Sequence, residues 1–84
     1  MLASSCRRKI LRILLVKDQI NIMELVRKAN STYNQVNSNL KLLEKEGIIV
    51  DKRFNHKRII KLNRKNSKIT YMSKILGLFS KSNY

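Results

Sequence analysis

The stretch that decides the fold runs from residue 22 to residue 60 and reads IMELVRKANSTYNQVNSNLKLLEKEGIIVDKRFNHKRII. Its first part predicts a short helix over about 23–29. At Asn30 and Ser31 that helix gives way to a longer one, which is rich in Ser, Thr, Tyr, Asn and Gln and ends at Gly47. We therefore expect two helices joined by a tight turn.

Two runs with β-type composition follow the second helix. The run 48–54 begins with three β-branched residues, and the run 57–62 returns after Asn55 and His56. Asn tolerates the positive φ that a two-residue hairpin turn requires. Two helices, a tight turn and a hairpin with a basic tip form the plan of a winged helix-turn-helix, in which the second helix enters a groove of duplex DNA.

Apolar spacing and helix caps predict the rest of the core. A first helix is expected over 5–17, followed by a short edge strand at 18–20. Asn21 and Glu24 have the spacing of a capping box and mark the start of the next helix. The recognition helix is expected at about 32–46, where a cap at Ser31 or Thr32 begins it. Its buried stripe consists of Val36, Leu40 and Leu43.

The predicted fold class is α+β and mainly helical, a winged helix-turn-helix with a three-helix core and a two-stranded β-hairpin wing, plus a C-terminal helix. The first unit covers 5–62 and the last helix 67–80. Four apolar residues of this helix are spaced three, four and three apart, as in a coiled-coil seam. They are Ile69, Met72, Leu76 and Phe79. We expect the seam to pair two copies into a homodimer; packing onto its own domain is the alternative.

Charge narrows the class of partner. The 84 residues contain 19 Lys and Arg against 5 Asp and Glu, which gives a net charge of +14. Beyond Asp51 there is no acid, while ten Lys and Arg remain. Such one-sided charge repels itself in a compact fold, so the composition favours a polyanionic partner. Double-stranded DNA is the first choice, and an anionic membrane surface ranks a distant second.

Several classes of function find no support in the composition. Cys6 is the single cysteine, so an intrachain disulfide is impossible and a thiolate metal site is not expected. One His, five scattered acids and two Gly form no triad, metal cluster or phosphate-binding loop. The sequence therefore predicts a non-enzyme without cofactor or small-molecule effector. It also contains no apolar run long enough to cross a bilayer, so we expect a cytoplasmic protein associated with the nucleoid.

The face of the recognition helix that remains outside the apolar stripe carries amides and hydroxyls. Asn and Gln can pair with adenine, Ser suits several base edges, and Lys takes a phosphate or guanine. Such amides and hydroxyls are moderate to weak helix formers, so their concentration on a surface helix indicates a function. Thr32 is better explained as a cap than as a contact. The predicted DNA-binding residues here are Thr32, Tyr33, Asn34, Gln35, Asn37, Ser38 and Lys41.

The tip of the hairpin gathers the second set of predicted DNA contacts. In a winged helix this hairpin lies along the backbone or reaches into the minor groove, where Arg is favoured. Strand alternation lets only some of the basic residues face DNA. We favour Arg53, Lys57 and Arg58, with His56 as a secondary candidate that the simpler interpretation makes an exposed turn residue.

The phrases LVRKAN at 25–30 and LKLLEKEGII at 40–49, followed by the basic hairpin, resemble the ArsR/MarR-like winged-helix transcription regulators. The similarity covers roughly 7–62 and is closest to the small archaeal members, including their winged-helix chromatin proteins. The metal-sensing ArsR members carry paired cysteines on the helix before the turn, and this helix has none. The chain also lacks the extra helices of most MarR members. The groove-facing positions implied by the resemblance are Tyr33, Asn34, Asn37, Ser38 and Lys41.

Three hypotheses follow from the sequence. The preferred one is a dimeric, sequence-specific regulator that binds double-stranded DNA. The alternative is an architectural, chromatin-type protein that coats duplex DNA with little sequence preference, which the high charge also favours. An RNA-binding or protein-interaction winged helix is the third, although the chain lacks an evident platform for stacking bases.

Overall fold

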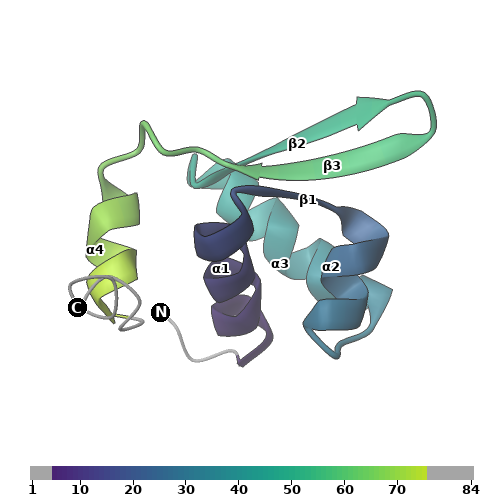
Figure 1. Ribbon diagram of the computed structural model, residues 1–84, viewed down its shortest axis with the longest axis horizontal. Coiled ribbons are helices and arrows are strands. Elements are labelled where there is room, and N and C mark those ends of the chain that lie inside the picture. Colours follow the sequence, from purple (N-terminus) through teal and green to yellow (C-terminus); the bar gives the residue numbers. More distant parts are fainter. Residues whose placement is uncertain (1–4, 76–84) are drawn as a thin grey trace.

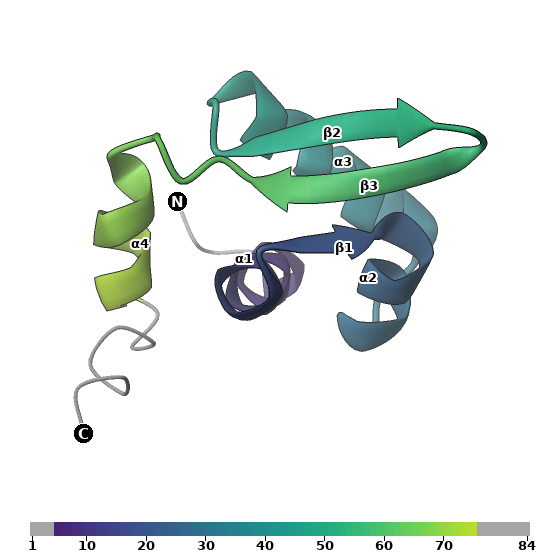
Figure 2. The same ribbon diagram turned by 45° about the horizontal axis from the view of Figure 1, so that its top comes forward.

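The structure is a computed structural model that describes residues 5–75, with the backbone alone for Met72, Ser73 and Ile75. Helices α1, α2 and α3 lie on one side of a three-stranded sheet, and α4 stands beyond the end of the sheet that is opposite the hairpin tip (Figures 1 and 2). This is the predicted α+β architecture. In chain order the elements are α1 (Ser5–Lys17), β1 (Gln19–Asn21), α2 (Ile22–Lys28), α3 (Tyr33–Lys45), β2 (Ile49–Phe54), β3 (Lys57–Leu62) and α4 (Lys68–Ile75).

The sheet is antiparallel with the strand order β1-β3-β2, so the second strand of the hairpin lies in the middle (Figure 2). In its register Arg53 faces Arg58 across the hairpin, and Phe54 faces Lys57. The two turn residues have φ angles of 50° at Asn55 and 67° at His56. Positive φ at both positions is the signature of a type I′ hairpin turn, as the sequence predicts.

The end of α1 and the edge strand match the sequence analysis closely. Helix α1 has the predicted bounds, and the expected edge strand is β1. The guanidinium of Arg64 donates from Nε to Asp18 Oδ1 at 2.9 Å and from Nη2 to the carbonyl of Leu15 at 2.9 Å. A cation on a carbonyl of the last turn complements the helix dipole. This arginine therefore fastens the chain after β3 to the end of α1.

Helix α2 begins at the predicted cap but without the predicted capping box. The Asn21 side chain accepts a hydrogen bond from the Met23 N–H at 2.8 Å, which makes Asn21 the N-cap. The carboxylate of Glu24 turns instead to Lys17 at 3.2 Å and to Lys28 at 3.9 Å. The helix ends just before Asn30, whose φ of 52° lies in the left-handed region and reverses the chain.

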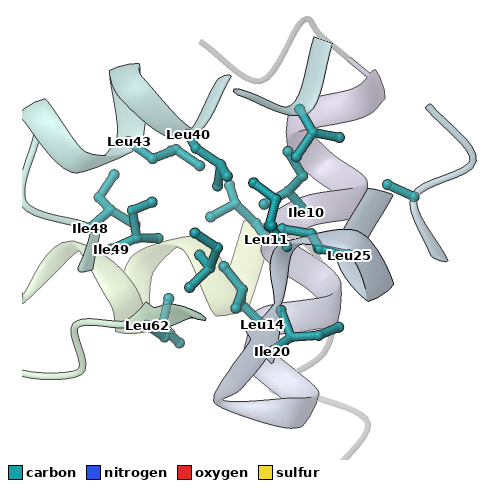
Figure 3. Close-up of a cluster of buried hydrophobic side chains, with 14 of the residues drawn as sticks. Ile10, Leu11, Leu14, Ile20, Leu25, Leu40, Leu43, Ile48, Ile49 and Leu62 are labelled. Carbon is teal, nitrogen blue, oxygen red and sulfur yellow. The ribbon is translucent and has the colours of Figure 1, made fainter. Parts of the chain in front are cut away.

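The core lies between α1, α2, α3 and the sheet (Figure 3). The predicted stripe of α3 is confirmed, because Val36, Leu40 and Leu43 are at most 3% exposed. The buried side chains of α1 and α2 meet this stripe from the other helices, and inward residues of β2 and β3 close the core. Its largest fully buried members are Ile10, Leu11, Leu14, Leu25, Val36, Leu40, Ile48, Ile60 and Leu62.

The segment between β3 and α4 is tied to the end of α3. Gly47 ends α3 with a φ of +75°, as predicted for a left-handed closing residue. Its carbonyl accepts hydrogen bonds from Asn63 Nδ2 at 2.8 Å and from Asn66 Nδ2 at 3.0 Å. Asn66 Nδ2 also lies 3.2 Å from the carbonyl of Glu46. Two asparagines thus satisfy carbonyl groups that a helix end leaves unpaired.

The last helix corrects one residue of the predicted dimer seam. The sequence places Ile69 on a surface that pairs two copies, but the structure buries it in the core of a single chain, where it is 5% exposed. Ile69 thus follows the alternative of packing on its own domain. The side chain of Met72, as well as Leu76, Phe79 and the predicted helix beyond residue 75, lie outside the described residues. No helix within 5–75 is long and apolar enough to span a membrane.

Candidate nucleic-acid interface

The start of α3 is fixed by a reciprocal cap. The hydroxyl of Thr32 accepts from the Gln35 N–H at 3.1 Å, and the Gln35 side chain accepts from the Thr32 N–H at 3.1 Å. In this capping box the hydroxyl oxygen of Thr32 and the side-chain oxygen of Gln35, two of the predicted DNA contacts, form hydrogen bonds at the start of the helix. Thr32 is the cap that the sequence predicts, whereas the capping role of Gln35 was not predicted.

An exposed polar stripe runs along α3 opposite its buried stripe. Asn34, Ser38 and Lys41 are all exposed and are spaced four and three residues apart. Lys45 follows four residues later on the same side, and it is exposed as well. The sequence analysis overlooked Lys45, although its spacing from Lys41 was the available signal. We call Asn34, Ser38, Lys41 and Lys45 the reading stripe.

Tyr33 and Asn37 lie one turn apart on the flank of α3. Tyr33 is 42% exposed, and its hydroxyl reaches a side chain of the wing. Asn37 is half-buried, and its Oδ1 atom is enclosed without a hydrogen-bond partner among the described residues. A bidentate pair with adenine needs both the oxygen and the nitrogen of the amide. In this rotamer only the Nδ2 donor of Asn37 is available to a base or phosphate.

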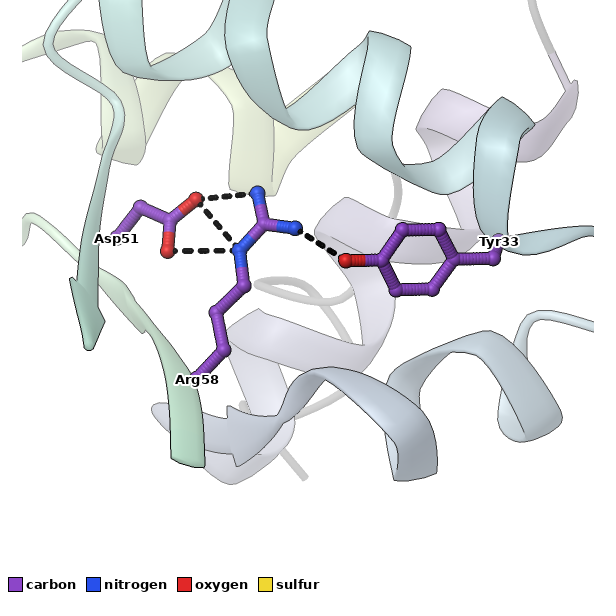
Figure 4. Close-up of polar contacts among 3 residues, drawn as sticks. All are labelled: Tyr33, Asp51 and Arg58. Carbon is purple, nitrogen blue, oxygen red and sulfur yellow. Dashed lines mark hydrogen bonds and ion pairs between the residues drawn. The ribbon is translucent and has the colours of Figure 1, made fainter. Parts of the chain in front are cut away.

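Arg58 occupies a different place from the one predicted. The sequence assigns it a DNA contact, but it points inward and is 9% exposed. Its Nε donates to both carboxylate oxygens of Asp51 at 3.0 Å, and its Nη2 donates to Asp51 Oδ2 at 2.6 Å (Figure 4). Its Nη1 donates to the Tyr33 hydroxyl at 2.9 Å. Arg58 is therefore a positioning residue that joins the wing to α3.

The ion pair settles the charge of this inner contact. Hydrogen bonds from Arg58 to the Asp51 carboxylate raise the pKa of Arg58 above its usual value, against the opposing effect of burial. Arg58 thus stays charged, and Asp51 compensates that charge. Removing one partner of a buried pair leaves the other uncompensated, which at this partly shielded site we expect to destabilise the fold by about 2 kcal/mol.

The exposed cations of the wing tip lie on both faces of the hairpin. Arg53, His56 and Lys57 are exposed, as the predicted contacts require. Arg53 pairs with Arg58 in the register, so it shares the face that looks toward α3, whereas Lys57 lies on the opposite face with Lys52. A hairpin tip with cations on both faces suits a groove with phosphates along both walls.

A buried amide sets the position of α3 against α1. Arg7 donates from Nε to Asn39 Oδ1 at 2.9 Å, and Asn39 Nδ2 donates to the carbonyl of Gln35 at 2.8 Å. Asn39 is 8% exposed and extends the buried stripe of the helix. The sequence analysis did not predict a role for Asn39. Its signal was the helical spacing of three from Val36.

The first two turns of α3, residues 33–40, contain no acidic side chain. Glu44 and Glu46 are at the far end of α3, and Asp18, Glu24 and Asp51 each contact a basic side chain. The first two turns of α3 therefore present neutral amide and hydroxyl groups, and the exposed cations beside them are Lys41, Lys45 and those of the wing tip. Among the residues that the structure describes, no three His, Cys, Asp or Glu side chains gather as metal ligands would.

Comparison with known proteins supports the fold. No protein-family model matches the chain, and no curated protein sequence matches it. The crystal structure of the AntR antimony-specific transcriptional repressor superimposes with a TM-score of 0.76 and 17% identity, over 96% of this chain and 72% of the repressor. Sso10a-2, a DNA-binding protein from Sulfolobus solfataricus, matches with a TM-score of 0.68 and 21% identity, over 92% of this chain and 76% of its own.

A longer protein gives the same result. A MarR-family transcriptional regulator from Silicibacter pomeroyi superimposes with a TM-score of 0.74 and 18% identity, over 94% of this chain. The match covers 53% of that regulator, so this chain spans about half of its length. At these identities the likeness concerns the fold, and it confirms the predicted resemblance at that level. The chain has the winged-helix fold of MarR-family and related transcriptional regulators.

Proposed function

We propose that this protein is a transcriptional regulator that binds double-stranded DNA sequence-specifically, with α3 in the major groove and the wing on the backbone or in the minor groove. The observation that carries the proposal is the reading stripe beside the cationic wing tip. Amide and hydroxyl groups supply hydrogen bonds to base edges, and Lys41, Lys45, Arg53 and Lys57 supply cations for the backbone. The winged-helix neighbours support the same use of the fold.

The rigid frame around the stripe supports base-specific contacts. Arg58 ties the wing to Tyr33, and Asn39 ties α3 to α1 through Arg7. Side chains that discriminate bases act through geometry, which a fixed helix and a fixed hairpin preserve. This favours a sequence-specific protein over one that only attracts phosphates.

We further propose that the regulator acts as a homodimer through the apolar residues of the C-terminal helix that follow Ile69. Met72, Leu76 and Phe79 remain the predicted contacts. A two-fold dimer suits half-sites about one helical turn apart. Native mass measurement across a range of protein concentrations tests this step, and a monomer at every concentration would overturn it.

The central experiment is a salt-titrated binding series on duplexes from the gene's own upstream region and on random duplexes, with footprinting of the upstream region. We expect a protected site and a preference that survives as salt weakens both affinities. Lys41→Ala should weaken both kinds of duplex and reduce the salt slope by about one. Asn34→Ala should remove the preference at one base pair, worth about 1–3 kcal/mol. Lys9→Ala on the exposed side of α1 is the control with the same charge change.

The architectural alternative has its own signature in this series. Uniform affinity for every duplex, no protected site and an unchanged preference in Asn34→Ala would favour a coating protein over a regulator. The net charge of +14 is the observation behind that alternative. Preference for single-stranded or structured RNA would instead support the third hypothesis.

A further inference from the structure

The face of the sheet that points away from the helices carries a second basic surface. Strand alternation buries Ile49, Ile60 and Leu62 against the helices, and it directs Lys52 and Lys61 to the opposite side, where both are exposed. Figure 1 shows α1, α2 and α3 all on the same side of the sheet, which leaves this outer face uncovered by them.

A shallow hollow of about 410 Å³ lies on that face at the root of the hairpin. It is bordered by the strands and by the segment that leads to α4, and four of its lining side chains are cations. We call this hollow the outer groove. Its charged lining residues are Asp18, Lys52, Lys61, Arg64 and Lys65.

The charges of the outer groove are not balanced within the described chain. Its one acid, Asp18, is paired with Arg64 at 2.9 Å. None of the acids in residues 5–75 forms an ion pair with Lys52, Lys61 or Lys65. Lys52 and Lys61 are diagonal neighbours on β2 and β3, so their side chains start about 7–8 Å apart. Repulsion between these cations disfavours a compact chain unless a polyanion covers them.

The same charges decide which partner fits. A second copy of the chain also carries +14, so it meets this face with repulsion. A row of phosphates meets it with attraction and releases counterions on binding. We propose that the outer groove binds the phosphate backbone of a second DNA duplex, so that one molecule holds two duplexes together. This inference rests on the proposed function for the first duplex.

The two surfaces are separate enough to be occupied together. The first duplex is read by α3 and the hairpin tip. The outer groove runs from the middle of the hairpin to its root, on the face of the sheet opposite α3. Figure 2 shows the tip and the root at opposite ends of β2 and β3. A contact made through Lys52, Lys61 and Lys65 involves phosphates alone and carries no base readout. The second duplex is therefore held without regard to its sequence.

A capture assay tests the proposal with the full chain. One duplex is immobilised on beads, and a fluorescent duplex of unrelated sequence is added in solution. Wild-type protein is expected to retain the fluorescent duplex. The variant Lys52→Gln, Lys61→Gln and Lys65→Gln should lower that retention about tenfold or more through lost phosphate contacts, while its binding to a single duplex changes by less than about threefold. Thermal unfolding confirms that the variant is folded.

The control variant removes three cations from the exposed side of α1 through Arg8→Gln, Lys9→Gln and Arg12→Gln, and it should retain the second duplex as the wild type does. Equal retention by the outer-groove variant would overturn the proposal. So would an equal loss of the first duplex, because the outer groove would then belong to the first interface. If the wild-type protein binds one duplex but never retains a second, the bridging proposal is refuted and the proposed function is not. If it binds no duplex at all, the proposed function is refuted as well.

Discussion

Arg58 of the wing donates a hydrogen bond to the hydroxyl of Tyr33 in the first turn of α3, at 2.9 Å. On its other side the same guanidinium is held by Asp51 through bonds of 2.6 to 3.0 Å. The guanidinium group of Arg is planar and rigid, so the bonds from Nε and Nη2 to Asp51 also fix the direction in which Nη1 points. The wing and α3 are consequently one geometric unit, and the distance between their predicted DNA contacts depends on this link.

Replacing Arg58 by Lys keeps the charge and removes the planar fork. We expect the free energy of unfolding to fall by about 2 kcal/mol, because an ammonium group cannot reach Asp51 and Tyr33 together. DNA affinity should fall for all sequences alike, since the wing loses its fixed position. Denaturant unfolding and binding isotherms measure both. Tyr33→Phe removes only the hydroxyl and should cost about 1 kcal/mol. Unchanged stability in Arg58→Lys would return Arg58 to the role of a phosphate ligand.

The pH dependence of this link follows from the pKa of Arg58. That pKa is raised in the folded state, so the stabilisation is present at every pH below the unfolded value and is lost only as pH rises through the folded value. Both values lie far above neutrality. The stability difference between wild type and Arg58→Lys should therefore stay constant from about pH 6 to about pH 9. A difference that shrinks within this window would show that another titrating group controls the link.

A substitution at Asn37 tests both the stability of the fold and the DNA specificity proposed for α3. Its Oδ1 is enclosed without a partner among residues 5–75, and an unsatisfied buried oxygen is unfavourable. Asn37→Ala should therefore raise the free energy of unfolding by about 1 kcal/mol, with help from the higher helix propensity of Ala. The same change should lower discrimination at one base pair. Chemical unfolding and binding to single-base variants measure the two effects; a loss of stability would mean that the oxygen has a partner.

Much of the fold could be predicted because its signals are local. The spacing of Val36, Leu40 and Leu43 defines one helical face, and Gly47 defines where that helix ends. The turn at Asn55 and His56 follows from the positive φ that Asn tolerates. These features depend on neighbours within a few residues, so the sequence carries them completely.

The wrong predictions concern what a given face of a strand or helix contacts. Arg58 lies two residues before the buried Ile60, so strand alternation had already placed it on the inner face. The DNA contact was nevertheless predicted for Arg58 because of its positive charge. For Ile69 no such signal exists, because an apolar helical stripe looks the same whether it meets its own core or a second copy. The partner of Asn39, Arg7, likewise lies 32 residues away in the sequence, so no local pattern indicates it.

His56 provides a prediction about the wing tip itself. Its φ of 67° is unfavourable for a residue with a Cβ, whereas Gly adopts it freely and is the usual partner of Asn in this turn. His56→Gly should raise the free energy of unfolding by about 1 kcal/mol. If His56 also contacts DNA, the more stable variant should bind DNA more weakly. Equal affinity in fluorescence anisotropy, with raised stability, would leave His56 as an exposed turn residue.

Gly47 sets the direction in which the chain leaves α3 toward the wing, and its carbonyl binds the segment before α4. Its φ of +75° penalises any L side chain, and an added Cβ would lie 3.3 Å from Asn66 Nδ2. Gly47→Ala should lower the free energy of unfolding by about 1–2 kcal/mol. Gly47→Asn adds the same Cβ but tolerates the left-handed conformation better, so it should lose less. Equal losses in the two variants, measured by denaturant unfolding, would show that the contact with Asn66 outweighs the backbone strain.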